Sequence, residues 1–153
     1  MLEPGQAAPD FTLPQDGGDP VTLSALRPAP VLVYFYPRDD TSGCTTEARD
    51  FTALQADFAA AGARVIGISK DSVAKHAKFR AKHDLGVMLL SDEEGDVCER
   101  YGVWQEKKMY GKTHMGIVRA SFLIGGDGTI VKVWPKVKVA GHAQEALDAV
   151  KAL

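Results

Sequence analysis

The chain has 153 residues, of which 45% are hydrophobic and 25% are charged, a size and composition typical of one globular domain with a full core. Its 18 Lys and Arg residues against 20 Asp and Glu residues leave a formal net charge of -2, so no overall field attracts nucleic acid or anionic lipid. We therefore expect a single domain over residues 1–153, with neither nucleic acid nor a membrane as its partner.

The N-terminal stretch MLEPGQAAPDF lacks the basic start and the apolar run of a secretory signal, and no apolar run approaches the ~18 residues of a membrane span. A cytoplasmic location is therefore expected. The two cysteines are too few for a disulfide scaffold and lack the spacing of a zinc site, and the four histidines form no HExxH motif. We expect no metal and no cofactor, and each cysteine needs its own explanation.

The first elements follow from the hydrophobic pattern. DFTLPQDGGDPVTL (10–23) has two short alternating runs around a Gly-Gly-Asp-Pro turn, which predicts an N-terminal β-hairpin. VLVYFYP (31–37) is a continuous apolar run that ends at proline, as in a strand buried on both faces. Apolar residues then recur at helical spacing from Thr45 to Ala61, where Gly62 supplies a C-terminal stop.

The alternation of strands and helices continues to the end of the chain. The predicted elements are a strand over 63–69, a helix over 72–84, a strand over 86–92, a short helix near 95–103, a strand pair over 120–134 and a helix over 142–153. The turn GGDG (125–128) lies between two strand-like runs and fits neither GxGxxG nor GxxxxGK[ST], so it predicts a hairpin and not a phosphate loop. This order predicts an α/β fold with a central mixed sheet flanked by helices and with antiparallel pairing late in the chain.

Cys44 lies where the loop after the first central strand gives way to the predicted helix. Unpaired N–H groups and the positive end of the helix dipole favour a thiolate at such a position, so the thiol becomes a nucleophile. The alternative is a buried cysteine that acts as a small apolar residue. Its neighbours are polar or small: Thr41, Ser42, Gly43, Thr45 and Thr46. These neighbours favour the reactive thiol.

Several cysteine chemistries fit this loop less well than attack on a peroxide. Four residues, none of them glycine, separate Cys44 from Arg49, which counts against a phosphatase loop, and TSGC has Thr41 where a thioredoxin-type CxxC has its first cysteine. A thiolate that attacks an O–O bond needs no further base, only donors for the departing alkoxide, and Thr41 is one such donor. A cysteine hydrolase, and a thioredoxin-fold redox or binding module without turnover, stay as alternatives.

The segment PRDDTSGC matches the PxxxTxxC signature of peroxiredoxins through Pro37, Thr41 and Cys44. The resemblance extends over nearly the whole chain, because six further segments are similar to the bacterioferritin comigratory, or Q-type, subfamily: AAPDFTL, VIGISKDS, LLSDEEG, YGVWQEKKMYGK, GIVRASFLI and DGTI. It implies a thioredoxin-like fold and a thiol-dependent peroxidase. The expected substrates are hydrogen peroxide and small organic hydroperoxides, reduced through a sulfenic acid on Cys44.

The resemblance also implies roles for individual residues. Cys44 would be the peroxidatic cysteine, Thr41 would hydrogen-bond peroxide and sulfur, and Pro37 would shield the pocket. Arg119 in GIVRASF matches the active-site arginine of the family, which could not have been selected from the residues alone, because an arginine at a strand start is usually a surface residue. Glu47 would orient an arginine, although an acid in the first turn of a helix is also favoured by the dipole alone.

The chain departs from the subfamily pattern at Arg49, where many members have the second cysteine that resolves the sulfenic acid as a disulfide. Either Cys98 resolves Cys44, or an external thiol such as glutathione, glutaredoxin or thioredoxin attacks Cys44 directly. Nothing in the sequence brings the two cysteines within the about 7 Å that a disulfide needs, and the pattern around Cys98 favours a residue that packs in a short helix over a resolving thiol. We therefore expect the protein to take its electrons from an external thiol. We also expect it to be a monomer.

Overall fold

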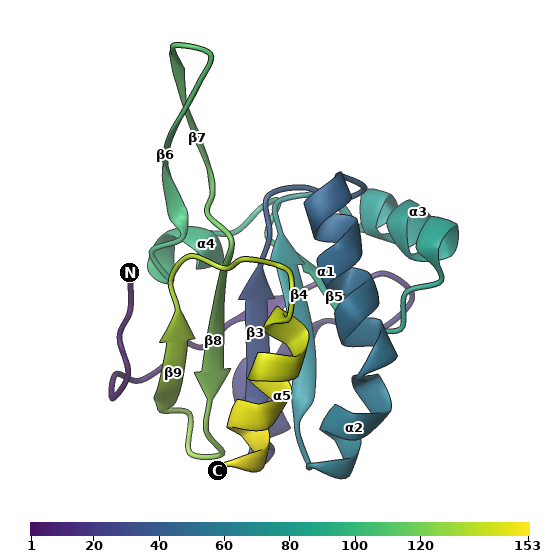
Figure 1. Cartoon of the computed structure of the whole chain (residues 1–153), viewed down its shortest axis with the longest axis vertical. Helices are drawn as coiled ribbons and strands as arrows, with labels where there is room; N and C mark the ends of the chain where they lie inside the picture. The colour runs from purple at the N-terminus through teal and green to yellow at the C-terminus, as the bar shows by residue number, and fades with distance from the viewer.

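A five-stranded sheet with the order β5-β4-β3-β8-β9 forms the centre of the protein in the computed structural model, which describes residues 1–153 (Figure 1). Two further antiparallel pairs, β1-β2 and β6-β7, lie outside this sheet. The elements in chain order are β1 Thr12–Leu13, β2 Val21–Thr22, the 3-10 helix η1 Leu23–Leu26, β3 Val31–Phe35, α1 Ser42–Ala53, α2 Gln55–Ala60, β4 Arg64–Ser69, α3 Val73–His83, β5 Met88–Ser91, α4 Val97–Arg100, β6 Trp104–Met109, β7 Lys112–Ile117, β8 Ala120–Ile124, β9 Ile130–Trp134 and α5 His142–Lys151.

The sheet is mixed, as predicted. Strand β3 pairs in parallel with β4, and β4 with β5, whereas β8 is antiparallel to both of its neighbours, β3 and β9. All five residues of β3 are buried, as the continuous apolar run predicted. Because β3 is the central strand, the connection that follows its carboxyl end, which we call the β3–α1 loop (residues 36–41), lies at the middle of one sheet edge.

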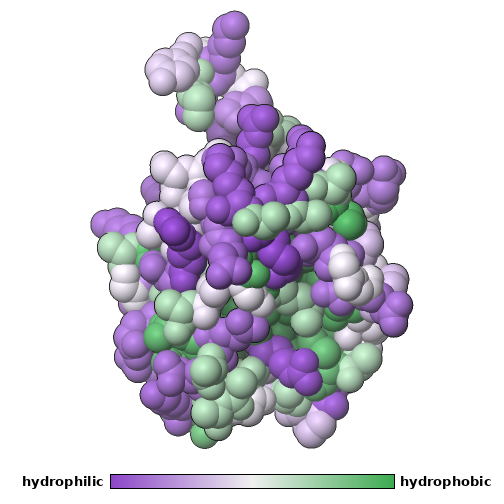
Figure 2. Space-filling model, turned by 90° about the vertical axis from the view of Figure 1, so that its right-hand side faces the viewer, coloured by the Kyte–Doolittle hydropathy of each residue, from purple (hydrophilic) through white to green (hydrophobic).

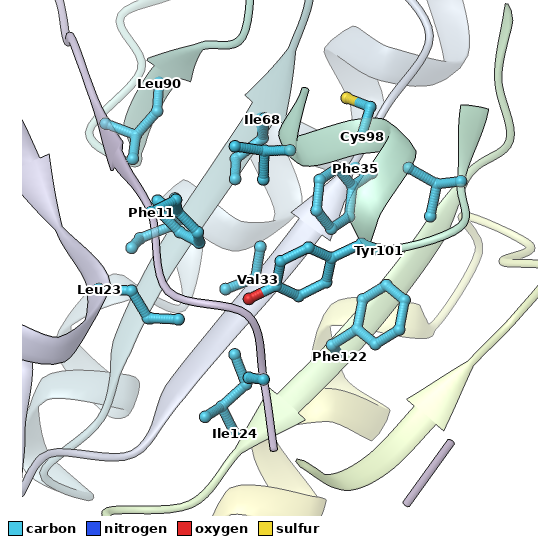
Figure 3. Packing of buried hydrophobic residues seen from close by; sticks show 14 of the residues in the cluster. Phe11, Leu23, Val33, Phe35, Ile68, Leu90, Cys98, Tyr101, Phe122 and Ile124 are labelled. Carbon is cyan, nitrogen blue, oxygen red and sulfur yellow. The ribbon is translucent and has the colours of Figure 1, made fainter. Parts of the chain in front are cut away.

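Both faces of the sheet are packed with apolar side chains. Val33 and Phe35 of β3 belong to a cluster on the face that α4 and the N-terminal segment cover, part of which Figure 3 shows. Leu32 and Tyr34 point to the opposite face, where the second cluster packs beneath α1, α2 and α5 (Figure 1). Because side chains alternate along β3, successive residues of this strand point into two different cores, one on each face of the sheet.

The helix predicted from Thr45 onward begins earlier and is broken in two. Thr41 has an extended backbone (φ -90°, ψ 157°), and its carbonyl accepts the N–H of Thr45 at 2.9 Å, so the helix α1 starts at Ser42. At Leu54 (φ -98°, ψ 6°) the chain leaves helical geometry before α2 begins. The earlier start makes Cys44 the third residue of α1, inside its first turn.

The pattern predicts no element for residues 104–117, where β6 and β7 form a hairpin that extends away from the rest of the protein (Figure 1; Figure 2). Its two-residue turn, Tyr110 and Gly111, has positive φ at both positions (52° and 73°), as a type I′ turn requires. Most side chains of this hairpin are exposed, and Tyr110 is 97% exposed. A strand that buries neither face shows no apolar alternation, which explains the missed prediction.

The remaining predicted elements are present within a few residues of their expected bounds. These include the N-terminal hairpin, in which Thr12 pairs with Thr22, and the hairpin β8-β9, whose turn holds the GGDG segment. No helix combines the length and the apolar character that crossing a membrane requires.

Candidate active site

Cys44 is buried, with 1% of its surface exposed, and packs in the cluster beneath α1. The sequence predicts polar surroundings for this thiol. In the structure its one hydrogen-bond partner is a guanidinium, while its other surroundings are largely apolar. The helix N-terminus and this cation are the two groups beside the sulfur that can interact with negative charge there, so the position suits a reacting thiol in spite of its burial.

Arg119 connects Cys44 to Glu47. Its Nη2 donates a hydrogen bond to the Cys44 sulfur at 3.4 Å, and its Nη1 donates to Glu47 Oε1 at 2.7 Å. The arginine directly precedes β8, whose first residue, Ala120, pairs with Phe35 at the end of β3. The register of β3 and β8 therefore brings the guanidinium of Arg119, which is distant in sequence, to the start of α1.

Gly43 leaves room for this guanidinium. A Cβ atom at residue 43 would lie 3.0 Å from Nη2 of Arg119, closer than ordinary van der Waals contact. Glycine inside a helix lowers stability relative to alanine. A glycine at residue 43 is therefore the one sign in the sequence that this position requires a residue without a side chain. A larger residue would have to displace the group that contacts the sulfur.

Glu47 is almost fully buried, and its second carboxylate oxygen has no hydrogen-bond partner. Burial raises the pKa of Glu47 to about 7, although the charge and the hydrogen bond of Arg119 lower it. The carboxyl group therefore gains or loses its proton near neutral pH, and the charge that holds Arg119 changes with it.

For the reaction of Cys44 with peroxide that the sequence resemblance implies, Glu47→Gln is expected to remove one pH-dependent component of the rate. Below about pH 6 Glu47 is mostly protonated and resembles glutamine, whereas above about pH 8 its carboxylate accepts the hydrogen bond of the Arg119 guanidinium as an ion pair, which is stronger than the same bond to a neutral carboxyl group. The ratio of kcat/KM for peroxide between wild type and variant should rise with pH over this interval, by about fivefold. Steady-state assays at matched ionic strength measure this ratio, and a ratio that does not change with pH contradicts the role.

The same shift has a consequence for stability. The unfolded chain releases the Glu47 proton near 4.5, but the folded protein retains it up to about 7, so the folded state loses stability as the pH rises between these values. Urea unfolding of wild type and Glu47→Gln across this interval measures the difference.

The β3–α1 loop carries Pro37 and Thr41. Pro37 is half-buried directly after Tyr36. The Thr41 hydroxyl is at the start of α1 and donates a hydrogen bond to the carbonyl of Arg38 at 2.9 Å, not to the sulfur of Cys44. The structure thus places both residues on the loop that leads into Cys44.

Lys107, which was not predicted as a site residue, is half-buried on β6. The aliphatic part of its side chain packs near Gly116 on β7, 3.2 Å from the place of a Cβ atom there. Burial and the charge of Arg119 lower the pKa of Lys107. The Lys107 ammonium is therefore close enough to the site for the charges of the two to interact. Nothing in the hydrophobic pattern distinguishes Lys107 from the other lysines of the hairpin.

Cys98 lies on the opposite face of the sheet from Cys44. It is completely buried on α4, in the cluster that contains Phe35 and Tyr101 (Figure 3). Burial and the neighbouring carboxylate of Asp92, which also accepts the Cys98 backbone N–H at 2.8 Å, raise the pKa of this thiol. Both cysteines are free thiols.

The fold and the relatives of the chain place it among the thiol-dependent peroxidases with a thioredoxin-like fold. Comparison with known proteins identifies the family. The model of the AhpC/TSA family matches residues 4–133, and the chain belongs to this family.

Relatives and solved structures resemble the chain over nearly all of its length. The putative peroxiredoxin bcp of Coxiella burnetii is 49% identical over 95% of this chain and 97% of its own. Peroxiredoxin Bcp of Bacillus subtilis is 47% identical, with 98% and 96% covered. The structure of the Xanthomonas campestris bacterioferritin comigratory protein is 45% identical with a TM-score of 0.87 (93% and 90% covered), and a Xylella fastidiosa PrxQ structure is 37% identical with a TM-score of 0.93 (99% and 97% covered).

Proposed function

We propose that the protein reduces hydroperoxides at Cys44 and is regenerated by an external thiol, without a second cysteine of its own. The Cys44 thiolate attacks one peroxide oxygen, the O–O bond breaks, and its electron pair leaves on the other oxygen as an alkoxide or hydroxide that takes up a proton. The products are a sulfenic acid on Cys44 and an alcohol or water. The reported alkyl peroxide reduction by the Xanthomonas campestris protein supports small organic hydroperoxides as substrates alongside hydrogen peroxide.

Arg119 has the central electrostatic role in this step. Its guanidinium already contacts the attacking sulfur at 3.4 Å, so its other donors are placed to stabilise charge on the departing oxygen. The Thr41 hydroxyl, at the start of the same helix, is proposed to hydrogen-bond the peroxide after it leaves the Arg38 carbonyl. Pro37 is proposed to shield the pocket from water. Because these groups come from one chain, the reaction is proposed to proceed in a monomer.

The proposal of an external reductant rests on the location of Cys98 and on its protonation. Cys98 lies on the other face of the sheet and its raised pKa keeps it as a thiol, which is a poor nucleophile. Arg49, at the position where many members of the subfamily pattern have a resolving cysteine, is exposed on α1. One external thiol would therefore form a mixed disulfide with Cys44 and release water, and a second would free Cys44. Glutathione, glutaredoxin and thioredoxin are the proposed reductants, and two free thiols suit a reducing compartment such as the cytoplasm.

Peptide mass spectrometry after one equivalent of hydrogen peroxide, under non-reducing conditions, tests this route. We expect a sulfenic acid trapped on Cys44, and a mixed disulfide when glutathione is added. Cys98→Ser should keep thiol-dependent turnover within about twofold of wild type, because Cys98 lies in a different core from Cys44 and takes no part in the proposed cycle. A disulfide between Cys44 and Cys98 in the oxidised protein would contradict the proposal.

The cysteine hydrolase alternative lacks its base. His76, His83 and His142 hydrogen-bond Asp39, Asp40 and Ser121 respectively, and no histidine contacts the Cys44 sulfur. The geometry therefore favours the peroxidase, in which the sulfur contacts a guanidinium and needs no neighbouring imidazole as base.

A further inference from the structure

A buried histidine outside the active site is bonded to the β3–α1 loop. His76, on α3, is completely buried, and its Nδ1 lies 2.6 Å from Oδ2 of Asp39. Its Nε2 lies 3.0 Å from the carbonyl oxygen of Leu90 on β5. A carbonyl can only accept a hydrogen bond, and a carboxylate accepts as well, so the geometry assigns a proton to each ring nitrogen and pairs an imidazolium with Asp39.

Asp39 is the point at which several elements hold the loop. Its side chain is 6% exposed and accepts a second hydrogen bond, from the Tyr36 hydroxyl at 2.6 Å. Its backbone N–H donates to the carboxylate of Asp71, next to α3, at 2.8 Å. The neighbouring residue, Asp40, adopts a left-handed backbone conformation (φ 59°), which is unfavourable for most residues and persists where the surroundings hold it.

Of the contacts that hold the loop, the buried ion pair between Asp39 and His76 is the one that water cannot readily replace. Burial lowers the pKa of His76, but the hydrogen bond and the charge of Asp39 outweigh burial, and the pKa is raised. A buried pair is costly to break because the remaining partner is left as an unpaired charge. The second contact between the loop and α3, from Asp40 to Lys82 and His83, is solvent-exposed on the side of the aspartate and contributes little by comparison.

We propose that Asp39 and His76 are positioning residues of the peroxidase: their ion pair holds the β3–α1 loop in the conformation that reacts with peroxide. This proposal rests on Cys44 as the reacting thiol. Pro37 and Thr41 lie on the loop, and Cys44 follows it within one helical turn. Because Cys44 is 1% exposed, a thiol whose sulfur carries a carbon chain needs more room at the sulfur than hydrogen peroxide does.

The two half-reactions should therefore respond differently when the pair is broken. Oxidation of Cys44 by peroxide depends on an ordered loop, because a small misplacement of reacting groups slows a reaction strongly. Reduction of the sulfenic acid by an external thiol depends on access, which a looser loop improves. A residue with a purely structural role would lower both rates together.

Single-turnover kinetics on His76→Gln test the proposal. The rates of Cys44 sulfenic acid formation by hydrogen peroxide and of its subsequent reduction by dithiothreitol are measured separately. We expect oxidation to slow by about tenfold while reduction does not slow. Tyr36→Phe removes one hydrogen bond to Asp39 and no charge, so it provides a milder variant that retains the fold and should show the same split to a smaller degree.

The variant Lys82→Ala is the matched control, because it removes an exposed ion pair to the neighbouring Asp40 and leaves the packing of His83 on Phe79 in place. Both of its rates should stay within twofold of wild type. The proposal is overturned if both half-reactions slow in parallel in the folded variants, if oxidation is unchanged, or if the control shows the same split. A wild-type protein that forms no sulfenic acid on Cys44 would contradict the proposed function instead.

Discussion

Replacing Cys44 by serine is expected to reduce peroxide consumption to the uncatalysed rate. A serine hydroxyl at this position stays protonated near neutral pH, even with the helix N-terminus and Arg119 beside it, and its oxygen is a far weaker nucleophile toward an O–O bond than a thiolate. Consumption of hydrogen peroxide with dithiothreitol as reductant measures the loss. Turnover that survives in Cys44→Ser would show that another group reacts with peroxide.

The fold should tolerate this substitution, so that the loss reports on chemistry. Serine is close to cysteine in size, and its hydroxyl can accept the hydrogen bond that Arg119 now donates to the sulfur. Thermal unfolding should shift by only a few degrees. The Cys98→Ser variant is the matched comparison, because it removes the other buried thiol, on the opposite face of the sheet, and leaves the reacting one in place.

Replacing Arg119 by glutamine is expected to lower kcat/KM for peroxide by about 10²- to 10³-fold, the usual effect of losing a donor that stabilises developing charge. Stability should change much less. The pKa of Glu47 is about 7 even beside Arg119, so without this cation the carboxyl group remains protonated instead of becoming a buried, unpaired charge. Steady-state kinetics and urea unfolding measured on the same preparations separate the two effects. Parallel losses of rate and stability would contradict this role.

Two milder variants separate the effect of the positive charge of Arg119 from the effect of the position of its guanidinium. Arg119→Lys keeps the positive charge but loses the fixed pair of donors that contact Cys44 and Glu47 together, so it should recover little of the rate. Gly43→Ala keeps the guanidinium but displaces its Nη2, which now lies 3.0 Å from the place of the new methyl group. Alanine is a better helix former than glycine, so a lower rate with equal or greater stability would show that the position of the guanidinium matters, and not only its presence.

The order of elements could be predicted from the sequence because its signals are local. The apolar run of β3, the turn before β9 and the helical spacing after Cys44 each depend on a few neighbouring residues. The prediction failed for the β6-β7 hairpin, which has no buried face and so no periodic signal, and at Leu54, where α1 ends in mid-pattern. Both failures fall where the local pattern does not decide the backbone.

The sequence by itself determined two properties of this protein: the mixed α/β order and the place of Cys44 at the start of a helix. The family resemblance added Arg119 and the departure from the subfamily pattern at Arg49. Only the tertiary structure decided how Arg119 meets Cys44, because this depends on the register of β8 against β3.

The tertiary structure likewise decided which face of the sheet holds Cys98 and how completely Glu47 and His76 are buried. The physical reason is that charge and reactivity at these groups depend on desolvation and on partners from distant segments, which meet only when the sheet assembles. The hydrogen bond between His76 and Asp39 spans 37 residues, and the one between Arg119 and Glu47 spans 72, distances over which no periodic pattern carries information.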